Sequence, residues 1–208
     1  MERETNLINV KHLFGQNFIG VEEIANISSK LGIKLPIILP EIPFTNEELI
    51  ARSTDSILIL GSDMMNDGKT LNLFSLRELF GIDPDKNEPC FYNQDWYLNE
   101  DFMQTSLENR WYLISKNVFE ESRSVLPSIL EKKYNFPLAI LCAYTFFIYW
   151  FHNKKVLWQN DFIWCADFDH NGDRIYVGKY TDSTNKNGFS IHRHLALRDS
   201  YATITVFQ

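Results

Sequence analysis

The chain has 208 residues, a formal net charge of −7, a hydrophobic fraction of 45% and a charged fraction of 23%. These proportions are ordinary for a folded protein and exclude an intrinsically disordered chain. The negative charge argues against general nucleic-acid binding, because an acidic surface repels the phosphate backbone.

The first residues are polar and carry no apolar stretch of the kind that a secretory signal has. We therefore expect a soluble protein in the cytoplasm, or one associated with a virion that is assembled there. The three cysteines are widely spaced and form no CxxC pair, so neither a disulfide framework nor a structural zinc site is indicated.

The N-terminal portion alternates between helical and strand patterns. Apolar residues at helical spacing predict a helix over 21–31, which a glycine ends. Thr45 is followed three positions later by a glutamate, and this capping-box spacing predicts a short second helix. The apolar run 57–60 predicts a buried strand, and a helical stripe over 73–80 follows it.

The middle of the chain is rich in aromatic residues, which we interpret mainly as partly buried core. A strand is predicted over 110–116 and a short helix over 124–133. The longest apolar run, 138–151, is shorter than the roughly 20 residues that span a bilayer. It therefore predicts a buried core helix, and we expect no membrane interaction.

The last quarter has the pattern of β-structure. Strands are predicted over 161–168 and 174–180, joined by a tight turn at Asn171 and Gly172. The alternation over 201–207 predicts a final strand that faces the core with Ala202, Ile204 and Val206. The fold expected is α+β, with a mixed α/β N-terminal portion (1–135) packed on a core helix and a C-terminal antiparallel sheet (136–208) as one compact unit.

One segment resembles the start of a calcium loop, in which alternate oxygen ligands surround a hard cation. It runs from Asp167 through Asp169 and Asn171 to Asp173, with a glycine at the sixth position. The twelfth position, where a bidentate glutamate belongs, is Gly178. A hairpin turn explains the same residues without an ion and is the preferred interpretation, so no cofactor is expected, with Ca²⁺ as the alternative.

No catalytic motif is present: the chain lacks G-x-S-x-G, a papain-like cysteine context, a P-loop and G-x-G-x-x-G. His192 and His194 are two apart and would face the same side of a strand, as half of a transition-metal site or as two exposed histidines. The sequence thus favours a non-enzyme. The alternative is a metal-dependent hydrolase or nuclease that uses residues 167–173.

Three stretches carry a resemblance to a known family. They are FGQNFIGVEE near the start, the Trp-Tyr-Leu-Ile strand at 111–114, and the final hairpin with its RIYVGKY strand at 174–180. In these the chain resembles uncharacterised proteins of small-genome bacteria and mobile elements. Its C-terminal part is similar to the C-type-lectin-like module of retroelement-diversified, formylglycine-generating-enzyme-like proteins. These modules carry a Trp/Asn/Asp-rich stretch before the last strand, whereas here residues 189–200 are rich in His, Arg and Leu.

The resemblance implies a non-catalytic binding or structural protein of a phage, prophage or other mobile element. Its contact surface would lie within residues 182–199. We expect His192, Arg193, His194 and Arg198 to contact a protein or glycan ligand.

Overall fold

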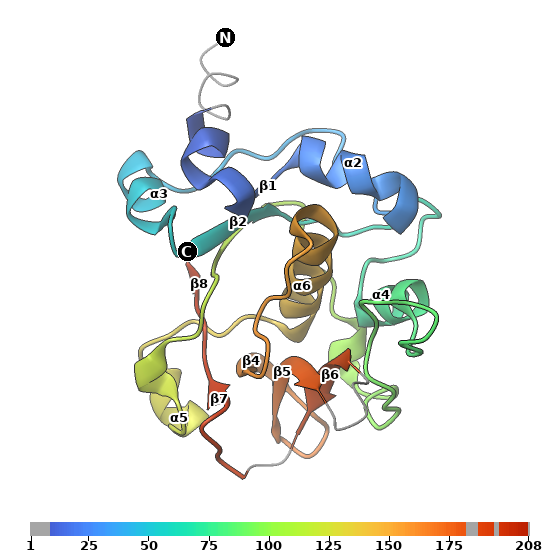
Figure 1. The fold of residues 1–208 in the computed structure, drawn as a ribbon, viewed down its shortest axis with the longest axis vertical. Coiled ribbons are helices and arrows are strands. Elements are labelled where there is room, and N and C mark those ends of the chain that lie inside the picture. Colours follow the sequence, from blue (N-terminus) through green and yellow to red (C-terminus); the bar gives the residue numbers. More distant parts are fainter. Residues whose placement is uncertain (1–8, 182–186, 194–195, 208) are drawn as a thin grey trace.

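The computed structural model describes residues 9–181, 187–193 and 196–207, and its elements form two sheets with a long helix between them (Figure 1). The helices are α2 (Val21–Leu31), α3 (Asn46–Arg52), α4 (Leu73–Phe80), α5 (Pro127–Leu130) and α6 (Ala139–Asn153). Short 3-10 turns are η1 (Gly15–Asn17), η2 (Asp101–Gln104) and η3 (Glu120–Ser122). The strands are β1 (Phe18–Ile19), β2 (Ser56–Leu60), β3 (Trp111–Ser115), β4 (Phe162–Phe168), β5 (Arg174–Thr181), β6 (Asn187–His192), β7 (Tyr201–Ala202) and β8 (Val206–Phe207).

The first sheet has the order β1-β2-β3-β8. β1 is parallel to β2, whereas β2, β3 and β8 are antiparallel neighbours. Every residue of β2 and β3 is buried, which explains why both strands are almost continuously apolar in sequence.

The second sheet has the order β6-β5-β4-β7 and holds the predicted hairpin, because β4 and β5 are antiparallel around Gly172. The prediction of a purely antiparallel C-terminal sheet is wrong in one respect, since β7 runs parallel to β4. The structure is therefore α+β with two mixed sheets. The C-type-lectin-like form of this fold stays a prediction.

α6 is the central element, and Figure 1 shows it between the two sheets. Ten apolar or aromatic residues of its first eleven positions, together with Thr145, are buried, so the helix is apolar on all sides. It reaches the first sheet through Tyr144, whose hydroxyl donates to the carbonyl of Leu60 at 3.0 Å. It reaches the second sheet at its start, where Asp167 of β4 accepts a hydrogen bond from the amide of Ala139 at 2.6 Å.

Most of the predicted elements are confirmed. Gly32 ends α2 in the left-handed conformation with φ of 63°. Thr45 and Glu48 form the expected reciprocal capping box at the start of α3. The predicted helix at 124–133 is reduced to the four residues of α5.

The last strand differs from its prediction. Residues 201–207 do not form one strand: β7 belongs to the second sheet and β8 to the first, with three residues crossing between them. Ala202 and Ile204 are buried as predicted, while Val206 is half-buried. β6 is not among the predicted strands, and it occupies part of the range 182–199 that the resemblance assigns to a contact surface.

None of the helices in the described part of the chain is both long enough and apolar enough to cross a bilayer. The core interpretation of the central aromatic residues is confirmed for the four that are at most 5% exposed: Phe91, Tyr97, Trp111 and Tyr112. Trp96 is the exception that matters below, because it is only partly buried.

Candidate binding site

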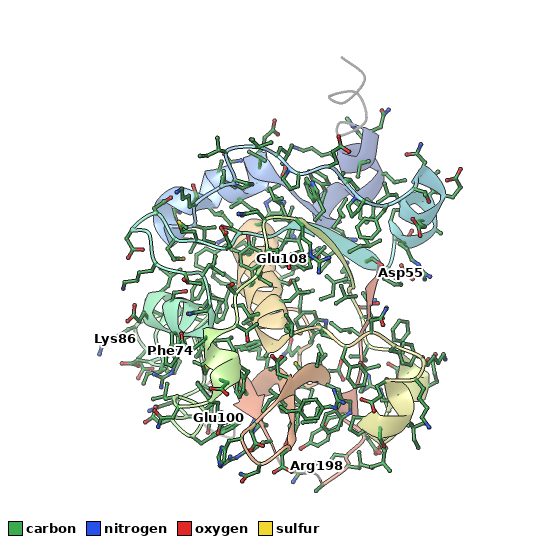
Figure 2. The ribbon with its side chains drawn as sticks, turned by 180° about the vertical axis from the view of Figure 1, so that it is seen from behind. Asp55, Phe74, Lys86, Glu100, Glu108 and Arg198 are labelled. Atoms are coloured by element: carbon green, nitrogen blue, oxygen red, sulfur yellow. The ribbon has the colours of Figure 1, made fainter. Side chains whose placement is uncertain are left out.

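The predicted ligand and metal residues lie at one end of the molecule, around the second sheet. Figure 2 shows Arg198 and Glu100 at this end, far from Asp55 and Glu108 near the first sheet. His194 lies outside the described residues, as do residues 182–186 of the predicted surface. The remaining predicted residues do not form one continuous surface, because strand geometry separates them.

Asp169 organises the β4–β5 turn. Its Oδ1 accepts hydrogen bonds from the backbone amides of Asn171 and Asp173, at 2.9 and 2.8 Å. Its Oδ2 accepts a hydrogen bond from the guanidinium of Arg193 at 2.8 Å. Burial opposes ionisation of this carboxyl, but these hydrogen bonds outweigh it and lower its pKa. Asp169 thus holds a hairpin turn, which is the interpretation preferred from the sequence.

Asp167 has a different environment, although it is only two residues away. Its carboxylate faces α6 and accepts the hydrogen bond from the amide of Ala139 that begins this helix. Burial, which outweighs its hydrogen bonds, raises the pKa of this carboxyl. Asp167 therefore acts as a buried cap of α6.

A different group of side chains converges in the described part of the chain: Glu100, Asp169 and His170 bring ligand-type atoms within 4.8 Å of one another. Glu100 is 6% exposed and accepts hydrogen bonds from both the backbone amide and the Nδ1 of His170, at 2.9 and 2.7 Å. The guanidinium of Arg193 lies 2.8 Å from Asp169 and 3.6 Å from Glu100. It supplies the positive charge that a metal ion would otherwise supply to these two carboxylates. The predicted Ca²⁺ loop stays a prediction. The residues predicted for it lie within 167–173, whereas the converging residues are Glu100, Asp169 and His170.

Arg193 also packs against the segment that precedes η2. Its guanidinium lies 4.5 Å from the centroid of the Trp96 ring, a cation–π geometry. The indole of Trp96 donates to the carbonyl of Ile191 on β6 at 3.2 Å. Arg193 is therefore a link between β6, the hairpin and the Trp96 segment, and its side chain is only 22% exposed.

His192 points to the opposite face of β6 and joins an aromatic cluster. The cluster lies on the face of the second sheet that is turned away from α6, and its rings have centroids 4.8–5.9 Å apart: Phe162, Trp164, Tyr176, His192 and Tyr201. His192 stacks on Tyr176 with an interplanar angle of 19°, and its Nε2 is buried without a hydrogen-bond partner among the described residues. Burial lowers the pKa of His192 to about 4, so the ring is neutral at neutral pH.

The segment 196–199 is an exposed part of this end. All four of its residues are exposed, including Leu197 and Arg198. Its last residue, Asp199, is nevertheless held by hydrogen bonds. Arg123 donates to the carbonyl of Asp199 at 3.2 Å, and the hydroxyl of Ser124 donates to the carboxylate of Asp199 at 2.8 Å. Arg123 is itself held by an ion pair with Asp161 at 2.7 Å. Of the four predicted contact residues, Arg198 is the one whose described side chain is free to meet a ligand.

Comparison of the chain with known protein families, with curated proteins and with solved structures finds no match. The function must therefore be argued from the chain's own geometry.

Sequence reasoning missed Glu100 and Trp96 as partners of the hairpin. Glu100 lies 70 positions from His170 in the chain, and no local pattern connects them. Arg193 and His192 were grouped because they are adjacent, although neighbouring residues of a strand point to opposite faces. The signal in the sequence that separates His192 from Arg193 is the alternation of β6, in which Phe189 and Ile191 are buried and face the core.

Proposed function

We propose that the chain is a non-catalytic binding protein that contacts a protein or carbohydrate ligand with the exposed segment 196–199. The observation that carries the proposal is that the segment is exposed while its backbone is held in place. Every residue of the segment is exposed, and its end is held by Arg123 and Ser124, which follow the turn η3. Loops of this kind, placed on a scaffold, are common recognition elements.

The chemistry of the segment suits recognition. Arg198 offers a planar guanidinium with five hydrogen-bond donors, and Leu197 offers an apolar side chain that is 37% exposed. The other charged groups at this end are engaged within the protein: Arg193 pairs with Asp169, and Glu100 pairs with His170. Leu197 and Arg198 are therefore the side chains of this segment that a ligand could contact. An origin in a phage, prophage or other mobile element remains part of the proposal through the sequence resemblance alone.

Site-specific photo-crosslinking tests the proposal. A photoreactive residue is placed at Leu197, and in a control chain at Ile50 of α3, which is 64% exposed near the first sheet. A ligand should crosslink at position 197 but not at position 50. A glycan array, probed with the unmodified chain, covers the carbohydrate ligands.

The matched variant is Arg198→Ala, which removes an exposed side chain and should leave the thermal midpoint unchanged. We expect it to reduce crosslinking at position 197, or glycan binding, at least about 10-fold, as loss of a central Arg contact costs 1–2 kcal/mol or more. Equal crosslinking at both positions, or unchanged binding by Arg198→Ala, would show that the surface is wrongly assigned.

A further inference from the structure

A cavity of about 450 Å³ opens beside β8, between α3 and the residues that follow α5. Figure 1 shows β8 in this place, with α3 above it and α5 below. The volume is in the range of small-molecule sites, which is about 300–1,000 Å³. This cavity lies on the first sheet and is separate from the surface proposed above.

Half of the residues that line the cavity are apolar or aromatic, and the other half are polar or charged. Leu113 of β3 is fully buried and forms part of its inner lining, and Val206 and Phe207 of β8 are half-buried beside it. Phe119 and Tyr134 stack on each other along another side, with ring centroids 4.7 Å apart and an interplanar angle of 20°. Such a lining favours a ligand with a flat or branched apolar body.

The acidic residues of the cavity are already engaged. Glu48 accepts hydrogen bonds from the amide and the hydroxyl of Thr45, at 2.8 and 3.0 Å, as part of the α3 capping box. Glu121 accepts a hydrogen bond from the Tyr134 hydroxyl at 2.8 Å and pairs with Lys133 at 3.3 Å. Both carboxylates are therefore already engaged in contacts within the protein.

Arg52 is the basic residue of the cavity whose charge is least satisfied. Its guanidinium lies 4.3 Å from the centroid of the ring of Phe207, which also lines the cavity. No described residue places a carboxylate within ion-pair distance of it. Glu48, one turn earlier on α3, is hydrogen-bonded to Thr45, and the charge of Arg52 is the smallest of the effects that lower the pKa of Glu48. Arginine binds carboxylates with two parallel hydrogen bonds, so Arg52 has unused donor capacity beside the aromatic part of the cavity.

We propose that this cavity binds an apolar carboxylate, with the carboxylate on Arg52 and the apolar body against Phe119, Tyr134 and Phe207. The same chemistry is offered by a free aromatic or branched acid and by the C-terminal residue of a peptide. A cationic or uncharged ligand would leave Arg52 without an ionic partner, which is why the ligand must be an anion with an apolar body.

Amide NMR spectra of the full chain test this with matched probes. The free acid is 3-phenylpropionate, and its neutral control is 3-phenylpropionamide. The peptide probe is a short acetylated peptide ending in Phe, with either a free or an amidated C-terminus. For ligands this small we expect a Kd on the order of 1 mM for the acids. Both amides should bind at least about 10-fold more weakly, because the Arg52 ion pair is lost.

The shifts should centre on the amides of Asn135 and Val206, which line the cavity. A tighter peptide would identify a protein C-terminus as the ligand, and a tighter free acid would identify a small molecule. Either result supports the proposal, provided that the acid is preferred over its amide.

The decisive variant is Arg52→Gln, which should abolish the preference for acid over amide. Arg110→Gln is the matched control, because Arg110 also lies over a ring, 4.5 Å from the centroid of Tyr112, but outside the cavity. It should leave the preference unchanged. Equal binding of acid and amide, shifts away from the cavity, no saturable binding below about 10 mM, or a preference that survives Arg52→Gln would overturn the proposal.

Discussion

His192 shows how a strand can make a surface-type residue half-buried, with one ring nitrogen fully shielded from solvent. In sequence it lies between Ile191 and Arg193 and close to a second histidine, which indicates exposure or metal binding. In the structure it stacks on Tyr176, and its Nε2 is buried without a partner among the described residues. Burial therefore favours the neutral ring and lowers its pKa from the ordinary 6.5 to about 4.

This lowered pKa predicts an acid-sensitive fold. Between pH 6.5 and about 4 the unfolded chain binds a proton at His192 that the folded chain does not bind. The contribution of His192 to stability is thus fully present above pH 6.5 and is lost as the pH falls toward 4. We expect a loss on the order of 2 kcal/mol, because each pKa unit corresponds to about 1.4 kcal/mol and partial exposure reduces the effect.

Urea unfolding at pH 7.5 and pH 5 measures this loss. His192→Phe keeps the stacked ring, removes the titration and should shrink the difference in unfolding free energy between the two pH values. His12→Gln, at an exposed position, is the control and should keep the difference. A wild-type difference that His192→Phe does not reduce would assign the acid sensitivity to other groups.

At the scale of elements, the β4–β5 turn and the start of α6 are held by two carboxylates that lie two residues apart. Asp167 caps α6, whereas Asp169 holds the turn, so two acids of one sequence pattern serve two elements. The calcium-loop pattern contains both residues. It cannot show which element each one serves, because that depends on where α6 begins in space.

The cap and the metal site make opposite predictions for Asp167→Asn. The neutral side chain can still accept the hydrogen bond from Ala139, and it avoids the cost of a buried charge. We therefore expect Asp167→Asn to leave the thermal midpoint unchanged or raised at pH 7. Asp167→Ala, which removes the cap, should lower stability by about 1 kcal/mol.

Thermal shifts with Ca²⁺, Mg²⁺, Mn²⁺ and Zn²⁺ complete this test, because an ion that binds the native state raises its midpoint. If an ion raises the wild-type midpoint and the shift disappears in both Asp167→Asn and Asp169→Ala, the residues act as metal ligands. In that case the interpretation of Asp167 as a helix cap would have to be replaced, and the alternative of a metal-dependent hydrolase would gain support.

On the scale of the whole molecule, the chain's last residues connect its two sheets. β7 pairs with β4 in the second sheet and β8 pairs with β3 in the first. Ile204, between them, is fully buried and belongs to the same core cluster as α6 and β2. Because one core contacts both sheets, neither sheet can lose its packing without exposing apolar surface of the other.

We therefore expect cooperative unfolding, in which the midpoints from far-ultraviolet circular dichroism and from tryptophan fluorescence coincide. Ile204→Ala should lower the unfolding free energy by about 2–5 kcal/mol, the usual cost of this truncation in a core. It should lower both midpoints together. As a control, Ile50→Ala at an exposed position of α3 should change the unfolding free energy by less than about 0.5 kcal/mol. Two separated transitions, only one of them affected by Ile204→Ala, would show that the sheets unfold independently.

The local elements could be predicted because their signals are contained in short stretches of sequence. The glycine after α2, the capping box at Thr45, the apolar run of β2 and the Asn-Gly turn each act over a few residues. Steric limits on φ and the pairing of nearby backbone groups are enough to set them.

The candidate sites could not be predicted in the same way, because their members are far apart in sequence. Arg193 meets Trp96 and Asp169, and Arg52 meets Phe207, only after the sheets have formed. The sequence by itself determined those helices and strands whose start, stop and turn signals are local, since these depend on local backbone energetics. The tertiary structure decided which charges are paired, which rings are buried and where a cavity remains, because burial and long-range contacts are properties of the packed chain.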